Sequence, residues 1–274
     1  MRNWGAAILL GLAACQQAEK PPAKPPEISF DGAKVASAVA LRAHGERLTH
    51  VLGCTGCHGA HLEGTLLTKD HPEWGPLYAS NLTAEVPEYT DSQLDSIIRH
   101  GAHPKRKTVW GMPSHVFHNL GDTDFRALVA FLRSLEPVGG KLPPPHFSAQ
   151  DRKDIAAGIY QPATQMVQES ERKQPLAVGP QYQLGRYIAS TTCEECHGSD
   201  LGGDPLSKTP NLVVASGYSR VQFETLITTG VPVGGRKLNP MMSGVAKTRF
   251  NHLTPHERDA LYAYLKARAD RLSR

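Results

Sequence analysis

The sequence predicts an all-α fold made of two similar halves in tandem. Residues 89–101 and 218–230 align without a gap, and each has the pattern of a short helix that begins at a Ser/Thr and Gln capping box and ends at glycine. A second matching pair, residues 122–135 and 255–269, has apolar residues at helical spacing. Helical segments containing Gly45 and Gly185 precede two widely separated cysteine pairs. Each half is therefore expected to run helix, cysteine motif, long loop, helix, loop, helix.

The cysteine pairs belong to a motif that occurs twice, as Cys54-Thr55-Gly56-Cys57-His58 and as Cys193-Glu194-Glu195-Cys196-His197. Cys-x-x-Cys-His is the attachment signature of a c-type haem. The thiols hold the haem covalently, and the histidine binds the iron. A zinc site would need the two pairs close together, and a redox-active dithiol has no need of the histidine. The sequence thus predicts two haems, attached at Cys54, Cys57, Cys193 and Cys196, with His58 and His197 as proximal iron ligands.

The fifth cysteine follows an apolar N-terminal run. Arg2 lies in a short basic start, and residues 4–14 are apolar but too few to span a bilayer, which predicts a cleaved export signal. Leu12-Ala13-Ala14-Cys15 resembles the lipobox of bacterial lipoproteins, which implies a lipidated Cys15 on a membrane. The absence of Asp at position 16 implies the outer rather than the inner membrane, on the periplasmic side. An ordinary secretory signal with a nearby free cysteine is the alternative.

Composition and proline-rich stretches indicate how the chain is divided into domains and linkers. With 274 residues, 40% of them hydrophobic, the chain can form two domains of about 100 residues. The formal charge of +4 and a single basic triplet at 105–107 give no reason to expect a nucleic-acid partner. We expect a signal peptide over 1–14, a lipidated Pro-rich tether over 15–34, a first domain over 35–136, a connection over 137–178 that contains a helix between 151 and 170, and a second domain over 179–274.

In these repeats and motifs the chain resembles class I cytochrome c domains, over roughly 35–136 and 179–270. The resemblance implies that the first and last helices of each domain cross beside a haem, and that a methionine on the loop before the last helix is the sixth iron ligand. Met112 and Met242 take that place here, with Met241 as the alternative in the second half. It also implies that a Pro-containing loop binds the proximal histidine. Thr209-Pro210-Asn211-Leu212 fits, whereas its counterpart Ala79-Ser80-Asn81-Leu82 has no proline.

Histidines near the methionines leave a different ligation open. His100, His103, His115 and His118 lie near Met112, and His252 and His256 lie near Met242. Imidazole is a good iron ligand, so bis-histidine coordination is the alternative at either haem.

The resemblance implies electron transfer rather than enzyme catalysis. A dihaem c-type cytochrome would carry single electrons between a periplasmic or membrane dehydrogenase and a downstream acceptor such as a cytochrome or oxidase. Iron with six ligands has no open position for a substrate, and no catalytic constellation is present in the sequence. The alternative is a dihaem enzyme of the cytochrome c peroxidase kind, in which one iron lacks a fixed sixth ligand.

Overall fold

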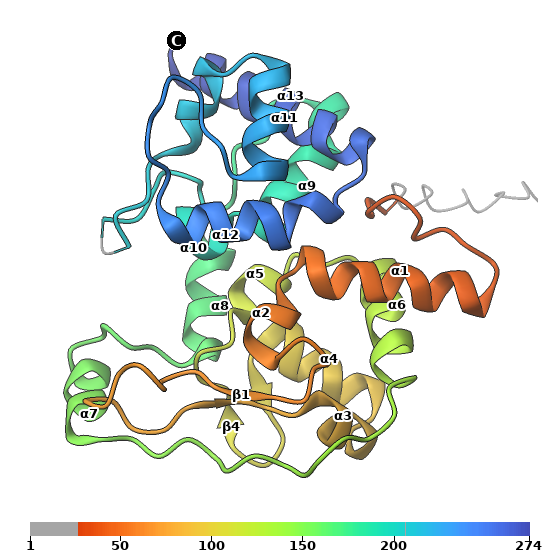
Figure 1. The fold of residues 1–274 in the computed structure, drawn as a ribbon, viewed down its shortest axis with the longest axis vertical. Helices are drawn as coiled ribbons and strands as arrows, with labels where there is room; N and C mark the ends of the chain where they lie inside the picture. Colours follow the sequence, from red (N-terminus) through yellow and green to blue (C-terminus); the bar gives the residue numbers. More distant parts are fainter. Residues whose placement is uncertain (1–26, 206) are drawn as a thin grey trace, which may run out of the picture.

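The computed structural model describes residues 27–205 and 207–274, which form two helical bodies joined by a long connection (Figure 1). The signal peptide, Cys15 and most of the tether predicted from the sequence lie outside the described residues. The first repeat contains α1 (Ala38–Val51), α2 (Cys54–His58), α3 (Leu82–Glu85), η1 (Val86–Glu88), α4 (Asp91–His100), α5 (Ser114–Phe117) and α6 (Asp122–Leu132). The second contains η2 (Pro180–Tyr182), α9 (Gln183–Thr192), α10 (Glu194–His197), η3 (Leu212–Gly217), α11 (Arg220–Thr229), α12 (Pro240–Thr248), η4 (Phe250–His252) and α13 (Pro255–Leu272).

The predicted all-α fold is confirmed, and in the part of the chain that the structure describes the strands form only two small hairpins, both in the first repeat. Strand β1 (Thr65–Leu66) pairs antiparallel with β2 (Tyr78–Ala79), and β3 (Ala102–His103) pairs antiparallel with β4 (Lys107–Thr108). Both hairpins shape the long loops between helices.

The first and last helices of each repeat cross at a glycine. A Cβ added to Gly45 of α1 would lie 2.0 Å from the carbonyl oxygen of Ala127 on α6. Gly185 of α9 has the same relationship to Ala260 on α13, again at 2.0 Å. Only a residue without a side chain allows the helix backbones to approach this closely. The same crossing therefore forms twice, with Leu48 and Ile188 fully buried beside it.

Capping boxes begin the helices at the predicted positions. Thr90 and Gln93 cap α4, Ser219 and Gln222 cap α11, and both helices end at a glycine with left-handed φ. At α13, Thr254 accepts the backbone N–H of Glu257, whose side chain accepts the backbone N–H of Thr254. These local bonds satisfy N–H groups that have no partner within the helix.

The connection between the repeats contains two helices rather than the single one expected, α7 (Ala149–Ala156) and α8 (Ala163–Glu171). It runs along the first repeat (Figure 1). Gly75 and Ser148 donate their backbone N–H groups to the Asp151 carboxylate, and Asn81 donates to the carbonyl of Val138 at 2.6 Å. The connection is thus bonded to the first repeat along much of its length.

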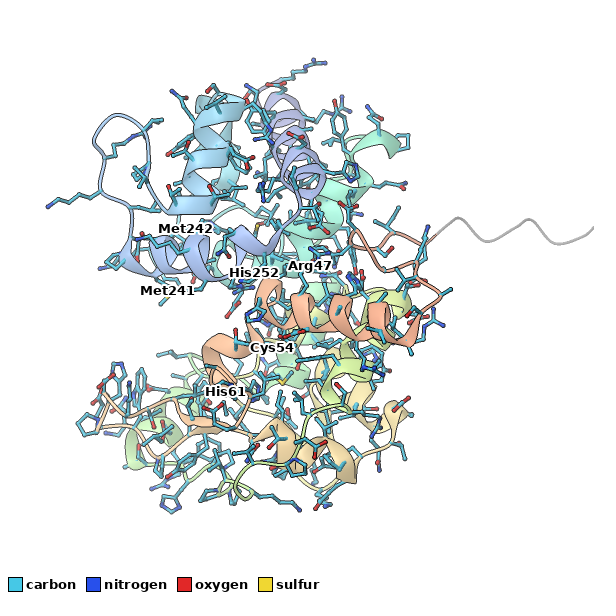
Figure 2. The ribbon with its side chains drawn as sticks, turned by 45° about the vertical axis from the view of Figure 1, so that its right-hand side comes forward. Arg47, Cys54, His61, Met241, Met242 and His252 are labelled. Carbon is cyan, nitrogen blue, oxygen red and sulfur yellow. The ribbon has the colours of Figure 1, made fainter. Side chains whose placement is uncertain are left out.

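Direct contacts also join the two repeats. Arg47 of α1 donates to the carbonyl of His252 at 3.1 Å (Figure 2). The rings of His50 and His252 stack with centroids 4.4 Å apart. Within the described residues, no helix has the length and apolar character needed to cross a membrane.

Candidate functional site

Both cysteine motifs form short helices directly after the first helix of their repeat. In the first, Gly53 has a φ of +81° and precedes Cys54, and Gly59 has a φ of +87° and follows His58. In the second, α10 follows α9, and Gly198 turns the chain in the same way with a φ of +77°. The left-handed glycines reverse the chain at once, so that cysteines and histidine stay on one compact turn.

The motif histidines are held in the same way in both repeats. His58 Nδ1 donates to the Ser80 carbonyl at 2.7 Å, and His197 Nδ1 donates to the Pro210 carbonyl at 2.8 Å. Ser80 performs this role without the proline that the second repeat has. Burial lowers the pKa of both histidines, and the hydrogen bond to the carbonyl opposes that shift. A neutral imidazole with its Nδ1 proton fixed leaves Nε2 free as a metal ligand.

The four motif cysteines are free thiols. Burial raises the pKa of Cys54 to about 12 and that of Cys193 to about 11. Without a bound group these two sulfurs are therefore protonated at neutral pH. The described residues contain no cluster of three or more histidine, cysteine and carboxylate side chains that could hold a metal ion, as a zinc site would require.

A cavity of about 370 Å³ opens beside the first motif, within the size range of cofactor sites. Cys54, Cys57 and His58 line it together with Met112, which comes from the loop before α5. Most of the remaining lining is apolar, and includes Leu52, Leu82, Val86, Leu94, Ile98, Leu128 and Leu132. The structure thus brings the four predicted site residues of the first repeat to one apolar cavity.

Sequence reasoning missed two groups that line the same cavity. Pro144, Pro145 and Phe147 come from the connection, and Glu195 comes from the motif of the second repeat. Trp110 packs on Phe147 with ring centroids 5.0 Å apart. No local pattern marks these residues, because their place depends on how the connection and the second repeat fold against the first.

The two methionines of the second repeat differ in exposure. The sequence predicted a loop here, which is wrong: Met241 and Met242 lie in the first turn of α12, where Asn239 caps Met241. Met241 is 69% exposed, whereas Met242 is partly buried against the core. Helix α12 lies on the side of the second repeat that faces the first (Figure 2). Of the two, Met242 is the one that the fold directs toward the protein interior.

The alternative histidine ligands are mostly bonded elsewhere. His103 lines the first cavity, but its Nδ1 accepts from the backbone N–H groups of Lys105 and Arg106, and its Nε2 contacts the Tyr89 hydroxyl at 3.2 Å. The others have contacts of different kinds: His100 with Asp95, His118 with Ser170 and Gln174, His252 with His50, and His256 with Asp31. His115 is buried with an unpartnered Nδ1 and is not among the residues that line the cavity.

Comparison with known proteins matches one family model twice. The cytochrome c model matches residues 43–136 and again 182–269, which together make up more than half of the chain. Both matches contain a cysteine motif and the helix crossing around it.

Curated relatives are components of larger redox proteins. A Cbb3-type cytochrome c oxidase subunit CcoP from Helicobacter pylori (strain 52) is 33% identical over 94 residues, which is 34% of this chain and 28% of the relative. A nicotinate dehydrogenase subunit from Pseudomonas putida is 25% identical over 219 residues, covering 73% of this chain and 18% of the relative. The chain spans less than a third of the length of these relatives. The two matched repeats show that the chain belongs to the cytochrome c family, with two of its domains in tandem.

Proposed function

We propose that the chain is a dihaem c-type cytochrome that carries single electrons between larger redox proteins. The observation that supports this most directly is the convergence of Cys54, Cys57, His58 and Met112 on one apolar cavity in the first repeat. Cytochrome c domains bind haem c covalently, and the residues at this cavity suit that group.

Each of these side chains has a distinct role in holding the haem. Cys54 and Cys57 would form the thioether bonds. His58, with its Nδ1 proton held by the Ser80 carbonyl, would bind the iron through Nε2. Met112 would be the second iron ligand from the protein, and a thioether ligand raises the reduction potential relative to a second histidine. The bound haem supplies reversible exchange between ferric and ferrous iron, and the surrounding protein sets its potential.

The repeated architecture supports an equivalent second site. Cys193 and Cys196 would attach the haem, His197 would bind the iron while its Nδ1 donates to Pro210, and Met242 would be the sixth ligand. The partly buried position of Met242 supports this choice over the exposed Met241.

Electron transfer suits the proposed coordination better than catalysis. With histidine and methionine on each iron, no position is left for a substrate. Relatives that are components of an oxidase and of a dehydrogenase support a donor and an acceptor of those classes. We further propose that the lipidated Cys15 holds the protein on the periplasmic face of a membrane, the outer membrane in preference to the inner.

Haem content is the first test. A mass spectrum of the denatured protein should show two covalent haems in the wild type and one in Cys57→Ala or Cys196→Ala. A wild-type chain with one haem or none would contradict the dihaem assignment.

Cys15→Ser tests the lipid anchor. The variant should release the cytochrome from the membrane fraction or block processing of the signal, and a processed, membrane-bound variant would contradict the anchor.

Peroxide turnover separates the carrier from the peroxidase alternative. Met112→Ala and Met242→Ala should open their irons to small ligands and lower their potentials, while the haems stay attached. Met241→Ala is the matched control and should leave spectra and potentials unchanged. Peroxide turnover should be negligible in the wild type and appear only in the two ligand variants; strong wild-type turnover would favour the enzyme.

A further inference from the structure

Arg249 lies between the two cysteine motifs. It follows α12 as the C-cap residue, and its Nη1 lies 2.8 Å from the carboxylate of Glu195, between Cys193 and Cys196. Its Nε donates to the carbonyl of Val51 at 3.2 Å, at the end of the helix that leads into the first motif. One guanidinium group therefore contacts the second motif itself and the chain just before the first.

The first motif leaves space for this guanidinium. Gly53 directly precedes Cys54, and a Cβ added there would lie 2.8 Å from Arg249 Cζ. The Arg249 side chain is only 11% exposed, and its Nη2 is buried without a hydrogen-bond partner. The positive charge is thus held away from water, against the backbone just before the first motif.

Glu195 also reaches across the boundary between the repeats. It belongs to the second motif, yet its side chain lines the first cavity. The guanidinium of Arg249 and the carboxylate of Glu195 therefore both lie at the boundary between the two motifs.

We propose that Arg249 is a positioning residue shared by the two haem sites, and that its charge and that of Glu195 set the two reduction potentials together. This inference rests on the dihaem function proposed above. Reduction adds one electron to a haem, so a nearby positive charge stabilises the reduced form and a nearby carboxylate destabilises it. The low exposure of Arg249 strengthens its effect, because solvent screens a charge less when it is held away from water.

Substitutions of the two charges should shift the potentials in opposite directions. In Arg249→Gln, Glu195 loses its counter-charge and both midpoint potentials should fall. In Glu195→Gln both should rise. We expect a change of roughly three- to tenfold in each reduction equilibrium constant, tenfold being about 59 mV for one electron. The double variant should lie between the single variants. Redox titration of the purified holoprotein, followed by visible absorption, measures both midpoints.

Arg220→Gln is the matched control. Arg220 forms ion pairs with Glu224 and Asp259 on the second repeat, so its removal also breaks ion pairs but should leave both midpoints in place. Glu195 is about a third exposed, so Glu195→Gln remains a valid test if Arg249→Gln does not fold.

The outcomes distinguish this inference from the proposed function. Shifts of equal sign in both variants would indicate a general structural disturbance and overturn it. A shift of one midpoint alone would show that the charge belongs to one site, which also overturns it. Two attached haems with unmoved potentials would overturn the inference and leave the cytochrome function intact, whereas a wild type without two haems would overturn both.

Discussion

Arg47 and Tyr187 make matching contacts in opposite directions across the boundary between the repeats. Each follows, by two positions, the glycine at which its helix crosses the last helix of its own repeat. Arg47 Nη1 lies 2.8 Å from the Glu257 carboxylate at the start of α13, and the Tyr187 hydroxyl donates to the Asp124 carboxylate at the start of α6 over 2.6 Å. Arg47 and Tyr187 occupy equivalent positions in their repeats, and each contacts the last helix of the other repeat. The same reciprocity is found in a two-fold symmetric dimer.

Tyr187→Phe should weaken this boundary. Asp124 is fully buried and accepts from the backbone N–H of Phe30 and from His44 as well as from Tyr187. Tyr187→Phe removes this bond and the one that the hydroxyl accepts from the backbone N–H of Gly121. Loss of the bond to the buried carboxylate alone should lower the free energy of unfolding by about 1.5–3 kcal/mol. Urea denaturation measures the change.

Val221→Ala is the control for this prediction. Val221 is 75% exposed on α11, and its truncation should stay within about 0.5 kcal/mol of the wild type. If Tyr187→Phe were no more destabilising than Val221→Ala, the contact with Asp124 would contribute nothing measurable.

The crossing glycines should tolerate no side chain. Alanine favours a helix over glycine, but at Gly45 or Gly185 its Cβ would overlap the backbone of the facing helix. The steric effect should exceed the propensity gain, so Gly45→Ala and Gly185→Ala should each destabilise by about 1–3 kcal/mol or more.

Gly244 provides the opposite case on α12. A Cβ there would meet nothing within 4 Å, so Gly244→Ala should stabilise by up to about 1 kcal/mol. Thermal unfolding of the three variants should therefore give two decreases in Tm and one increase. A common sign for all three would contradict the helix-crossing geometry.

The lowered pKa of His103 predicts that the protein loses stability in mild acid. Burial, with help from the charges of Arg106 and Lys105, lowers the pKa of His103 to about 4. An unfolded chain titrates near 6.5, so between pH 6.5 and 4 the unfolded state binds more protons than the folded state. The contribution of neutral His103 to the free energy of unfolding is thus fully present above about pH 6.5 and is lost as the pH falls toward 4.

The pH dependence of Tm across this range and up to neutral pH tests the assignment. His103→Gln should reduce the slope between pH 6.5 and 4, because the titrating group is gone. Val221→Ala is the control, since Val221 is exposed and has no titrating group, and it should leave the slope unchanged. A His103→Gln slope equal to that of the wild type would show that another group causes the acid sensitivity.

Local features of the fold were predictable from the sequence. The capping boxes at Thr90, Ser219 and Thr254 depend on residues three positions apart, and the terminating Gly101 and Gly230 need only a left-handed φ. Such signals act within one helical turn, so a linear pattern contains them.

Features that depend on distant segments were not predictable. The sequence around Met242 suggested a loop, and only the Asn239 cap and Pro240 at the first helical position hint that a helix begins there. The contact of Arg249 with Glu195 and the packing of Phe147 on Trp110 join segments far apart in the sequence. Spacing along the chain does not encode such contacts, because they follow from how the repeats and the connection pack.

Phe147 should affect the reduction potential of the first haem and not that of the second. It lines the first cavity from the connection, between Trp110 at a centroid distance of 5.0 Å and Tyr160 at 6.4 Å. Phe147→Ala should open this side of the cavity to water. Water stabilises the more highly charged ferric state, so the potential of the first haem should fall while that of the second stays unchanged.

Redox titration of Phe147→Ala beside Ile159→Ala tests this prediction. Ile159 lies on the same connection but is 67% exposed, so its truncation should leave both midpoints in place. Identification of the shifted haem comes from combining each variant with Cys196→Ala, which should hold only the first haem. In that background Phe147→Ala should still lower the single midpoint, because the connection contacts the first repeat. An unchanged midpoint there would show that the connection does not shield the first haem, however closely Phe147 packs on Trp110.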